Sequence, residues 1–239
     1  MINFFSLFVK NTIVFFDIFV HRKRIKKILS KIKNIKVETI YDIGANNCEY
    51  SIIFNKIFPS AKIFAFEPNP YLCDQAKKKL KKANTIKIIM NAVGNNNKTM
   101  KIKIEKNSPL TTSLAEINHN SKTSKIKKFL NQKNKLEIIK IKMLRIDNFI
   151  KKNKLPDFIK IDVEGYEEEV LKGMKNNLKK IKMIMIEFHF DNQYKNYNTS
   201  RLHNTLVKNN FRIYKSIKFP ILNWEDRIYL NLSLPNFNN

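Results

Sequence analysis

From residue 38 onward, short apolar runs alternate with helical segments, and this order constrains the fold more than any other feature of the chain. Each run has the length of a strand, and the run at 182–188 is almost continuously apolar, as parallel strands covered on both faces must be. Such an order, without internal repeats, predicts an α/β fold with a mostly parallel, doubly wound sheet. The predicted strands of this series lie at 39–43, 61–66, 85–90, 157–163 and 182–188.

Further strands are predicted outside this series. Residues 99–105 and 137–144 alternate between apolar and polar side chains, which is typical of strands with one exposed face. The closing pair, at 211–215 and 227–232, predicts an antiparallel strand near one edge of the main sheet. Residues 107–135 are polar and predict a long loop with one helix, and loops of that length are usually functional or disordered.

Residues 1–35 form an extension of different character, which leaves residues 36–239 as the main domain. The first half of the extension is strongly apolar and the second half is basic. A signal peptide lacks support because no small-residue cleavage site follows the apolar run. A membrane-spanning helix is disfavoured because the run is barely long enough and contains Lys10 and Asp17. We expect a helix that docks on the domain, with peripheral contact between residues 1–33 and a membrane as the alternative.

Glycine is scarce in this chain, which makes its four positions informative. Gly44, Gly94 and Gly165 each follow a predicted strand, whereas Gly173 lies late in a predicted helix. A simple turn explains any one of them taken alone. Because the carboxyl ends of parallel strands line a single crevice, the three together predict a ligand site at that edge of the sheet.

Two acidic residues are expected beside this crevice. Asp42 precedes the Gly44 turn, and Glu67 ends the next strand, where a carboxylate can accept hydrogen bonds from ribose hydroxyls. Glu67 can also complement the dipole of the helix that begins near Pro68. A nicotinamide enzyme would share Glu67, but the turn lacks the GxGxxG series that cradles a pyrophosphate. A cofactor without phosphate and with a cationic sulfonium fits better, which predicts S-adenosyl-L-methionine.

The motifs along the chain allow a closer assignment. The strings YDIGANNCEYS, FEPNP, NAVGN, IDNF, KIDVEGYE, LKG and IEFH occur in this order. Over roughly residues 38–190 the chain resembles the FkbM-type family of S-adenosylmethionine-dependent methyltransferases, and KIDVEG after DIGAN is the most specific pair. The resemblance implies a class I methyltransferase Rossmann-like fold. It also implies methylation, usually at oxygen, of a sugar, a polysaccharide or glycolipid precursor, or a natural product.

The resemblance further implies which residues hold the cofactor. One departure is Cys48, which stands where the family usually carries the second glycine of the loop. Its side chain either crowds the amino-acid end of the cofactor or is a small buried group that fits a slightly wider turn. The expected cofactor-binding residues are Asp42, Gly44 and Asn46 in the loop, Glu67 at the ribose, and Asn91 and Ala92 beside the adenine.

Four titratable residues that follow or end neighbouring strands are candidates for catalysis. By the resemblance, Asp162 stands near the methyl group and the acceptor. A hydroxyl acceptor must lose a proton, and histidine is the side chain that ordinarily titrates near neutral pH. Structural alternatives are a helix cap for Glu164 and an ion pair between Glu187 and Lys160. The catalytic candidates are Asp162, Glu164, Glu187 and His189, with His189 as the natural base, and no ligand spacing predicts a metal site.

Charge and cysteine content bear on partners and location. The formal net charge is +26, but lysine is spread over the whole chain, so we do not expect nucleic acid as a partner. Cys48 and Cys73 cannot form a disulfide framework, which favours the cytoplasm, with a peripheral position at the inner face of the membrane as the alternative. The acceptor, a small molecule or a glycan, is expected to be selected by loops at 107–135, 193–201 and 220–226.

Two competing functions remain from the sequence. An RNA methyltransferase acting on exocyclic amines would carry a proline-containing aromatic turn where residues 162–165 read DVEG. A cytosine-carbon enzyme would need a nucleophilic cysteine at the same place. The other alternative is a membrane-associated, non-catalytic relative that has kept the fold and lost cofactor binding through Cys48.

Overall fold

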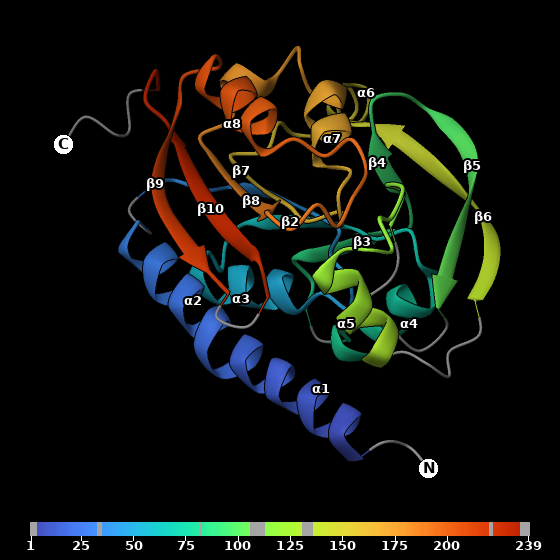
Figure 1. Ribbon diagram of the computed structural model, residues 1–239. Coiled ribbons are helices and arrows are strands. Elements are labelled where there is room, and N and C mark those ends of the chain that lie inside the picture. Colours follow the sequence, from blue (N-terminus) through green and yellow to red (C-terminus); the bar gives the residue numbers. More distant parts are fainter. Residues whose placement is uncertain are drawn as a thin grey trace.

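The computed structural model describes residues 4–32, 35–81, 83–105, 113–130, 136–219 and 222–234, and Figure 1 shows their arrangement. The helices are α1 (Phe4–Phe16), the π-helical turn η1 (Asp17–His21), α2 (Arg22–Lys31), α3 (Glu49–Ile57), α4 (Pro70–Lys79), α5 (Lys122–Leu130), α6 (Ile146–Ile150), α7 (Glu167–Gly173), the 3₁₀ turn η3 (Leu178–Lys180) and α8 (Thr199–Val207). The strands are β1 (Thr39–Ile43), β2 (Lys62–Phe66), β3 (Ile86–Ile89), β4 (Ala92–Gly94), β5 (Lys98–Glu105), β6 (Leu136–Arg145), β7 (Phe158–Ile161), β8 (Met183–His189), β9 (Phe211–Lys218) and β10 (Trp224–Asn231).

Seven strands form the main sheet in the order β3-β2-β1-β7-β8-β10-β9. Neighbouring strands from β3 to β8 are parallel, whereas β10 pairs antiparallel with both β8 and β9. The prediction of a mostly parallel sheet with an antiparallel strand near one edge is therefore confirmed. Ile43 lies opposite Phe66 of β2 and Ile161 of β7, so the carboxyl ends of three central strands meet at one edge.

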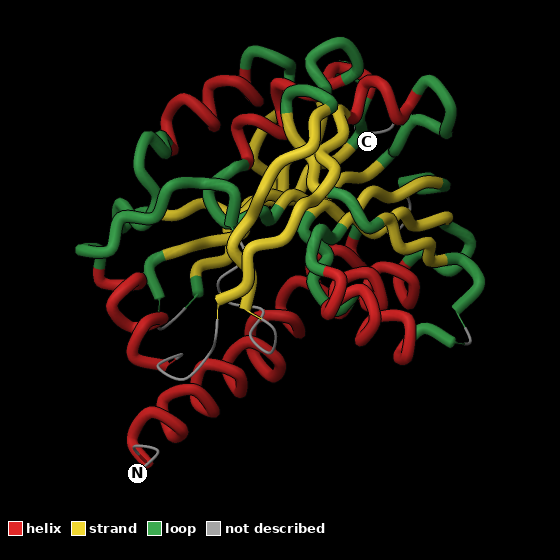
Figure 2. The backbone as a smooth tube through the Cα atoms, turned by 90° about the vertical axis from the view of Figure 1, so that its right-hand side faces the viewer, coloured by secondary structure: helices red, strands yellow, loops and turns green. Residues whose placement is uncertain are grey.

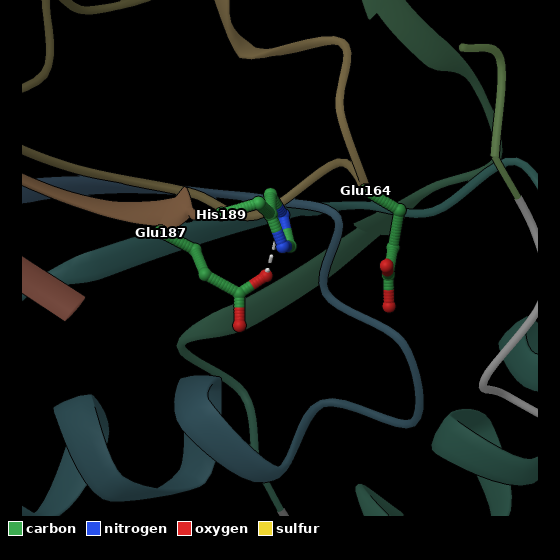
Figure 3. A group of neighbouring side chains, drawn as sticks. All are labelled: Glu164, Glu187 and His189. Atoms are coloured by element: carbon green, nitrogen blue, oxygen red, sulfur yellow. Dashed lines mark ion pairs between the residues drawn. The ribbon is translucent and has the colours of Figure 1, made fainter. Parts of the chain in front are cut away.

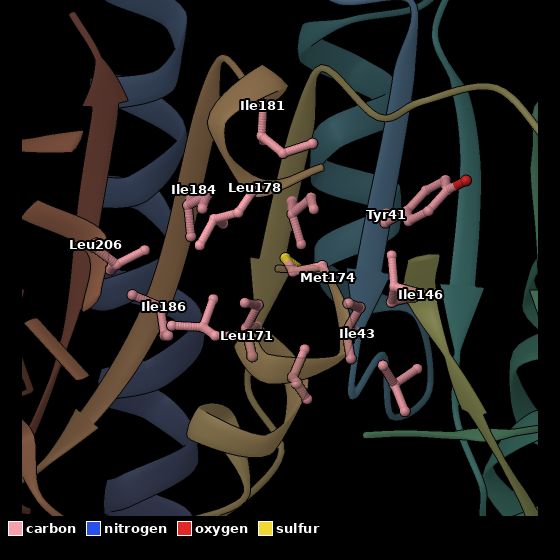
Figure 4. Packing of buried hydrophobic residues seen from close by; sticks show 14 of the residues in the cluster. Tyr41, Ile43, Ile146, Leu171, Met174, Leu178, Ile181, Ile184, Ile186 and Leu206 are labelled. Atoms are coloured by element: carbon pink, nitrogen blue, oxygen red, sulfur yellow. The ribbon is translucent and has the colours of Figure 1, made fainter. Parts of the chain in front are cut away.

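Apolar layers cover both faces of this sheet, which explains why its central strands are so apolar. On one face, Leu171 of α7 and Leu206 of α8 pack with Ile43 and Ile186 (Figure 4). On the other face, Phe54 of α3 packs in a cluster that includes residues of α2, β7 and β10. All five residues of β1 are buried, so the loop beyond β1 starts from a fixed point.

A second, smaller sheet has the order β4-β6-β5 and stands at the side of the main sheet (Figure 1). β5 and β6 are the alternating segments that the sequence predicted, and they pair antiparallel with each other. The sequence did not predict that β4, which closely follows β3, joins these strands rather than the main sheet. Within the expected long loop, α5 is the predicted helix, and residues 106–112 and 131–135 lie outside the described part of the chain.

The N-terminal extension forms one helical rod, and the first turns of this rod project from the body of the protein (Figure 2). Ile25 and Leu29 of α2 are fully buried against the main domain. Among the described residues, no helix combines the length and the apolar character needed to cross a bilayer. The division of the chain at residue 35 stays a prediction.

Candidate functional site

A pocket opens where β1, β2 and β7 end, at the edge that the glycine positions predicted. Six of the ten predicted site residues line it. Apolar side chains from four separate segments complete its wall, so the lining combines charged and apolar groups. Its lining residues are Gly44, Asn46, Glu67, Pro68, Leu72, Ala92, Val93, Leu114, Asp162, Val163 and Glu164.

The turn at Gly44 depends on the absence of a side chain. Its φ is +78°, and a Cβ built there would lie 1.7 Å from the backbone oxygen of Asp162. The β1 turn therefore lies directly against the end of β7, because Gly44 lets the two backbones meet. The N–H groups of Gly44 and Ala45 both donate to the Phe66 carbonyl, at 3.0 and 2.9 Å, which fixes the turn to β2 as well.

Asp42 lies beneath this turn and not in the wall of the pocket. Its side chain is fully buried, one carboxylate oxygen accepts a 2.6 Å hydrogen bond from Ser51, and the other has no hydrogen-bond partner. Burial raises the pKa of Asp42, although the Lys160 ammonium, 3.8 Å away, favours the ionised form. Asp42 therefore anchors the start of α3 and contributes negative potential below the pocket.

Asn46 and Glu67 join the two loops that form the floor of the pocket. The Asn46 N–H donates to one Glu67 carboxylate oxygen at 2.9 Å, and the Asn69 N–H donates to the other at 2.9 Å. Burial raises the pKa of Glu67 to about 7, against the stabilising effect of these two donors. The carboxylate is thus held in place before any ligand arrives, as a ribose acceptor must be.

Asn91 and Ala92 are placed differently from each other. Ala92 is buried and lines the pocket wall together with Val93 and Leu114. The Asn91 side-chain amide instead donates to the Lys142 carbonyl of β6 at 3.1 Å, which ties the end of β3 to the second sheet. The role of Asn91 beside an adenine stays a prediction.

Cys48 occupies the N-cap of α3 in a left-handed conformation, with a φ of +64°. This backbone conformation favours glycine, which gives a physical reason for the glycine that the family resemblance led us to expect here. The Cys48 side chain is fully buried and packs with Ala45, Ala65 and Ala76 rather than lining the pocket. Its contacts favour the second of the two interpretations, a small buried residue in the turn.

Lys160 is buried at the centre of the site. The sequence suggested Glu187 as its partner, but the structure pairs it with other carboxylates. Its ammonium lies 3.0 Å from Asp162 and 3.8 Å from Asp42, and 4.7 Å from the centre of the Tyr50 ring. Burial alone would lower the pKa of Lys160, but the two carboxylates outweigh it and raise the pKa. Burial likewise opposes ionisation of Asp162, yet Lys160 lowers the pKa of this carboxyl. The alternative that Lys160 pairs with Glu187 is not what the structure shows.

Glu164 stands at the mouth of the pocket in a strained backbone conformation, with a φ of +55°. Its carboxylate accepts a 2.8 Å hydrogen bond from Lys127 of α5 and another from the Tyr194 hydroxyl. The N-cap of α7 is Tyr166, and no side chain caps this helix, so the capping role considered for Glu164 is not what the structure shows. Glu167 instead accepts hydrogen bonds from the N–H groups of Val163 and Gly165 in the turn that precedes α7.

Glu187 and His189 end β8 and face the same space as Glu164 (Figure 3). The Nε2 atom of His189 lies 3.1 Å from a Glu187 oxygen, a contact that is an ion pair only when the imidazole is protonated and that lacks the alignment of a hydrogen bond. Burial raises the pKa of Glu187 well above its ordinary value, and the nearby Asp162 and Glu164 charges add to this effect. One ligand atom from each of Glu164, Glu187 and His189 lies within 4.8 Å of the others, a set that could hold a cation. The absence of a metal site stays a prediction. The ion pair between Lys127 and Glu164 supports it, because it already neutralises one of the three possible ligands.

Sequence reasoning missed the partners of these groups. Lys127 and Tyr194 come from two of the loops that we expected to select the acceptor, and no local pattern marks either of them. The third of those loops begins at Pro220, outside the described residues, and its described end packs on the N-terminal helix through Trp224 and Asp226.

The residues of the pocket fit S-adenosyl-L-methionine on structural grounds. Glu67 lines the pocket and would accept hydrogen bonds from the ribose, and Ala92, Val93 and Leu114 would form an apolar wall beside the adenine. The buried carboxylates of Asp42 and Asp162 supply negative potential for a cationic sulfur. The turn needs no phosphate cradle, because the cofactor carries no phosphate.

Two solved structures of methyltransferases have a similar fold. A precorrin-6y C5,15-methyltransferase from Geobacter metallireducens matches with a TM-score of 0.50 and 13% identity, over 87% of each chain. The N-methyltransferase NodS from Bradyrhizobium japonicum matches with a TM-score of 0.50 and 11% identity, over 90% of this chain and 98% of that one. At these identities the similarity establishes the fold and not the acceptor.

Sequence comparison gives the family. Hexuronic acid methyltransferase AglP from Haloferax volcanii is 28% identical over 154 residues, which are 64% of this chain and 56% of that protein. The match thus spans a little over half the length of this relative. The model of the methyltransferase FkbM domain matches residues 42–213, which contain every residue assigned above to the cofactor pocket. The chain therefore belongs to the FkbM family of methyltransferases, and its cofactor is S-adenosyl-L-methionine.

Proposed function

We propose that the protein methylates a hydroxyl oxygen of a sugar, in a glycan or glycolipid precursor. The observation that carries this proposal is the pair of Glu187 and His189 at the end of β8, beside Asp162 and next to the cofactor pocket. An alcohol oxygen is a poor nucleophile while it keeps its proton, so a site for hydroxyl methylation needs a group that takes this proton.

The cofactor supplies a methyl group that is already activated by its bond to a cationic sulfur. The chain therefore has to align the acceptor oxygen with that methyl group and to receive one proton. Alignment of this kind can contribute about 7–11 kcal/mol to lowering a barrier. A positioned base adds a rate factor of about 10²–10⁴.

His189 is the base in this proposal. Its Nε2 atom is buried and has no aligned hydrogen bond, so its lone pair is open to a hydroxyl proton. Burial and the neighbouring charges of Asp162 and Glu164 raise the pKa of Glu187, which disfavours its charged form beside the imidazole. Tyr194 and Tyr197 pack edge-on against the imidazole, with ring centres 4.8 and 5.5 Å away, and fix its orientation.

The name of the relative from Haloferax volcanii supports a sugar acceptor for this chain, since that protein is a hexuronic acid methyltransferase. A hexuronic acid offers two kinds of oxygen, hydroxyl and carboxylate. A carboxylate acceptor is already ionised and needs no base, whereas a hydroxyl must lose its proton, and His189 beside Glu187 is placed to take it. We therefore favour a hydroxyl oxygen.

The test is transfer of a labelled methyl group from S-adenosyl-L-methionine to a glycan and glycolipid fraction, with total RNA as the competing acceptor. We expect label in the glycan fraction that survives mild alkali, because an ether is stable there and a methyl ester is hydrolysed. The His189→Asn variant should lose this label. Preferential labelling of RNA, or label released by alkali, would contradict the proposal.

A further inference from the structure

The outer face of the N-terminal rod exposes large apolar side chains. Phe8, Phe15 and Phe19 recur at a spacing that places them on one side of a helix, and Val14 and Ile18 lie beside them. Groups of exposed large apolar side chains on a protein surface often mark an interaction site, so this one is expected to bind a partner. The exposed fractions are 63% for Phe8, 46% for Val14, 53% for Phe15, 42% for Ile18 and 50% for Phe19, and we call these five residues the apolar face.

Basic side chains follow the apolar face along the same rod. Ile25 and Leu29 of α2 point into the protein, while the remaining face of this helix is charged. The Lys23 ammonium lies 5.3 Å from the centre of the Phe19 ring, which joins the two surfaces. The exposed basic residues of α2, which we call the basic face, are Lys23, Arg24, Lys26, Lys27 and Lys31.

The rod is fixed to the protein where the two faces meet. His21 is 1% exposed, bonds Asp226 of β10 at 2.7 Å, and packs edge-on against Trp224. Asp17 is the only acidic residue between Phe4 and Lys31, and it is neutralised by Arg22 at 2.5 Å. The outward surface of the rod therefore carries apolar and positive groups without negative ones.

We propose that the apolar face and the basic face together dock the protein on the surface of an anionic lipid bilayer. Phenylalanine side chains would enter the boundary between headgroups and acyl chains, and the lysines and arginine would lie against anionic headgroups. A second copy of the chain is a poorer occupant, because the basic faces of both copies and two net charges of +26 would be brought together. The proposal is independent of the acceptor, since docking needs no methyl transfer.

The N-terminal rod lies near the crevice, because it contacts a helix that reaches the pocket. α1 packs beside α5 (Figure 1), and Lys127 of α5 bonds Glu164 at the mouth of the pocket. α5 thus connects α1, which carries part of the apolar face, to Glu164 of the pocket.

Vesicle sedimentation with the full chain tests the proposal. We expect the wild type to bind vesicles of phosphatidylcholine with phosphatidylglycerol. The Phe15→Ser/Phe19→Ser variant should bind at least about tenfold more weakly, because two large apolar groups no longer enter the lipid. The Lys23→Gln/Lys26→Gln/Lys27→Gln variant should lose about tenfold or more on anionic vesicles, with little change on pure phosphatidylcholine.

Matched controls separate docking from general effects. Ile138→Ser/Ile213→Ser removes two exposed apolar side chains from strands, and Lys101→Gln/Lys103→Gln/Lys140→Gln removes three exposed charges from the second sheet. Both controls should bind vesicles like the wild type, and all variants should keep the wild-type affinity for S-adenosylhomocysteine as a check on folding. Absence of vesicle binding by the wild type, or equal loss in the controls, would overturn the proposal. A wild-type dimer that becomes monomeric in Phe15→Ser/Phe19→Ser, without vesicle binding, would also overturn it in favour of a second copy.

Discussion

The two halves of the crevice are built in different ways. In the cofactor half, Gly44, Asn46 and Glu67 are held by backbone N–H groups and by the contact between two strand ends. In the acceptor half, Glu164 and His189 are held by side chains such as Lys127 and Tyr194, which come from distant loops. Because the cofactor half is held by backbone contacts, we expect it to tolerate few substitutions. The acceptor half is held by side chains, so substitutions there can change the acceptor while the fold stays the same.

The largest effect is expected from Gly44→Ala, which would disrupt the cofactor half. The new Cβ would collide with the Asp162 carbonyl, and the φ of +78° disfavours alanine. We expect a fall of about 3 kcal/mol or more in the free energy of unfolding and no measurable binding of S-adenosylhomocysteine. Denaturant unfolding and calorimetric titration check the two parts.

The matched control for this change is Asn210→Ala. Asn210 also has a positive φ, of +69°, but it precedes β9 at the opposite edge of the sheet from the crevice. This variant should lose some stability and keep its cofactor affinity. If Gly44→Ala binds S-adenosylhomocysteine like the wild type, the close contact between β1 and β7 does not shape the pocket.

The next largest effect is expected from His189→Asn, which removes the proposed base from the acceptor half. Loss of the base should lower kcat by a factor of about 10²–10⁴ while the affinity for S-adenosylhomocysteine stays unchanged. His203→Asn is the control, because His203 bonds Tyr229 away from the pocket. An unchanged kcat in His189→Asn would show that His189 is not the base. Parallel losses of kcat and affinity would show that His189 also contributes to cofactor binding.

A smaller effect is expected from the ionisation of Glu67. Its pKa in the folded protein is about 7, above the ordinary 4.5, because burial disfavours the charged form. The stability that this residue contributes is therefore full below pH 4.5 and is lost as the pH rises through about 7. Affinity for S-adenosylhomocysteine should move the other way and rise about fivefold over the upper part of this range, since a carboxylate accepts stronger hydrogen bonds from ribose.

Calorimetric titration with S-adenosylhomocysteine at several pH values measures the affinity. Thermal unfolding of the ligand-free protein at the same pH values measures the stability, and the two should change in opposite directions. In Glu67→Gln the affinity slope should become flat in this window and the stability slope should become shallower, because other buried carboxyls with raised pKa values, such as Glu187, still titrate. Affinity that falls as the pH rises through 7 would contradict the role of Glu67 as a ribose acceptor.

The smallest effect is expected from Cys48→Gly. Glycine relieves the left-handed conformation at a φ of +64° but removes a buried side chain, so the free energy of unfolding should change by about 1 kcal/mol or less. Because Cys48 points into the protein, the affinity for S-adenosylhomocysteine should change less than about threefold. A tenfold gain in affinity would show that Cys48 crowds the cofactor after all.

The same difference between the halves explains what the sequence could predict. Gly44 and Glu67 follow directly from a strand, a turn and a helix in succession, so local pattern and the family motifs place them. Lys160 lies inside an apolar strand, and its pairing with Asp162 rather than Glu187 depends on which way the side chain turns. Lys127 and Tyr194 reach the site through tertiary packing, which no local pattern encodes. The second sheet was missed for a similar reason, since β4 pairs with β6 far along the chain.

The most direct measurement of the account is a crystal structure with S-adenosylhomocysteine bound. We expect ribose hydroxyls within about 3 Å of the Glu67 carboxylate, and the sulfur facing the space between Asp162 and the Glu187–His189 pair. A ligand whose ribose lies away from Glu67, or whose sulfur points away from His189, would contradict the assignment of the two halves.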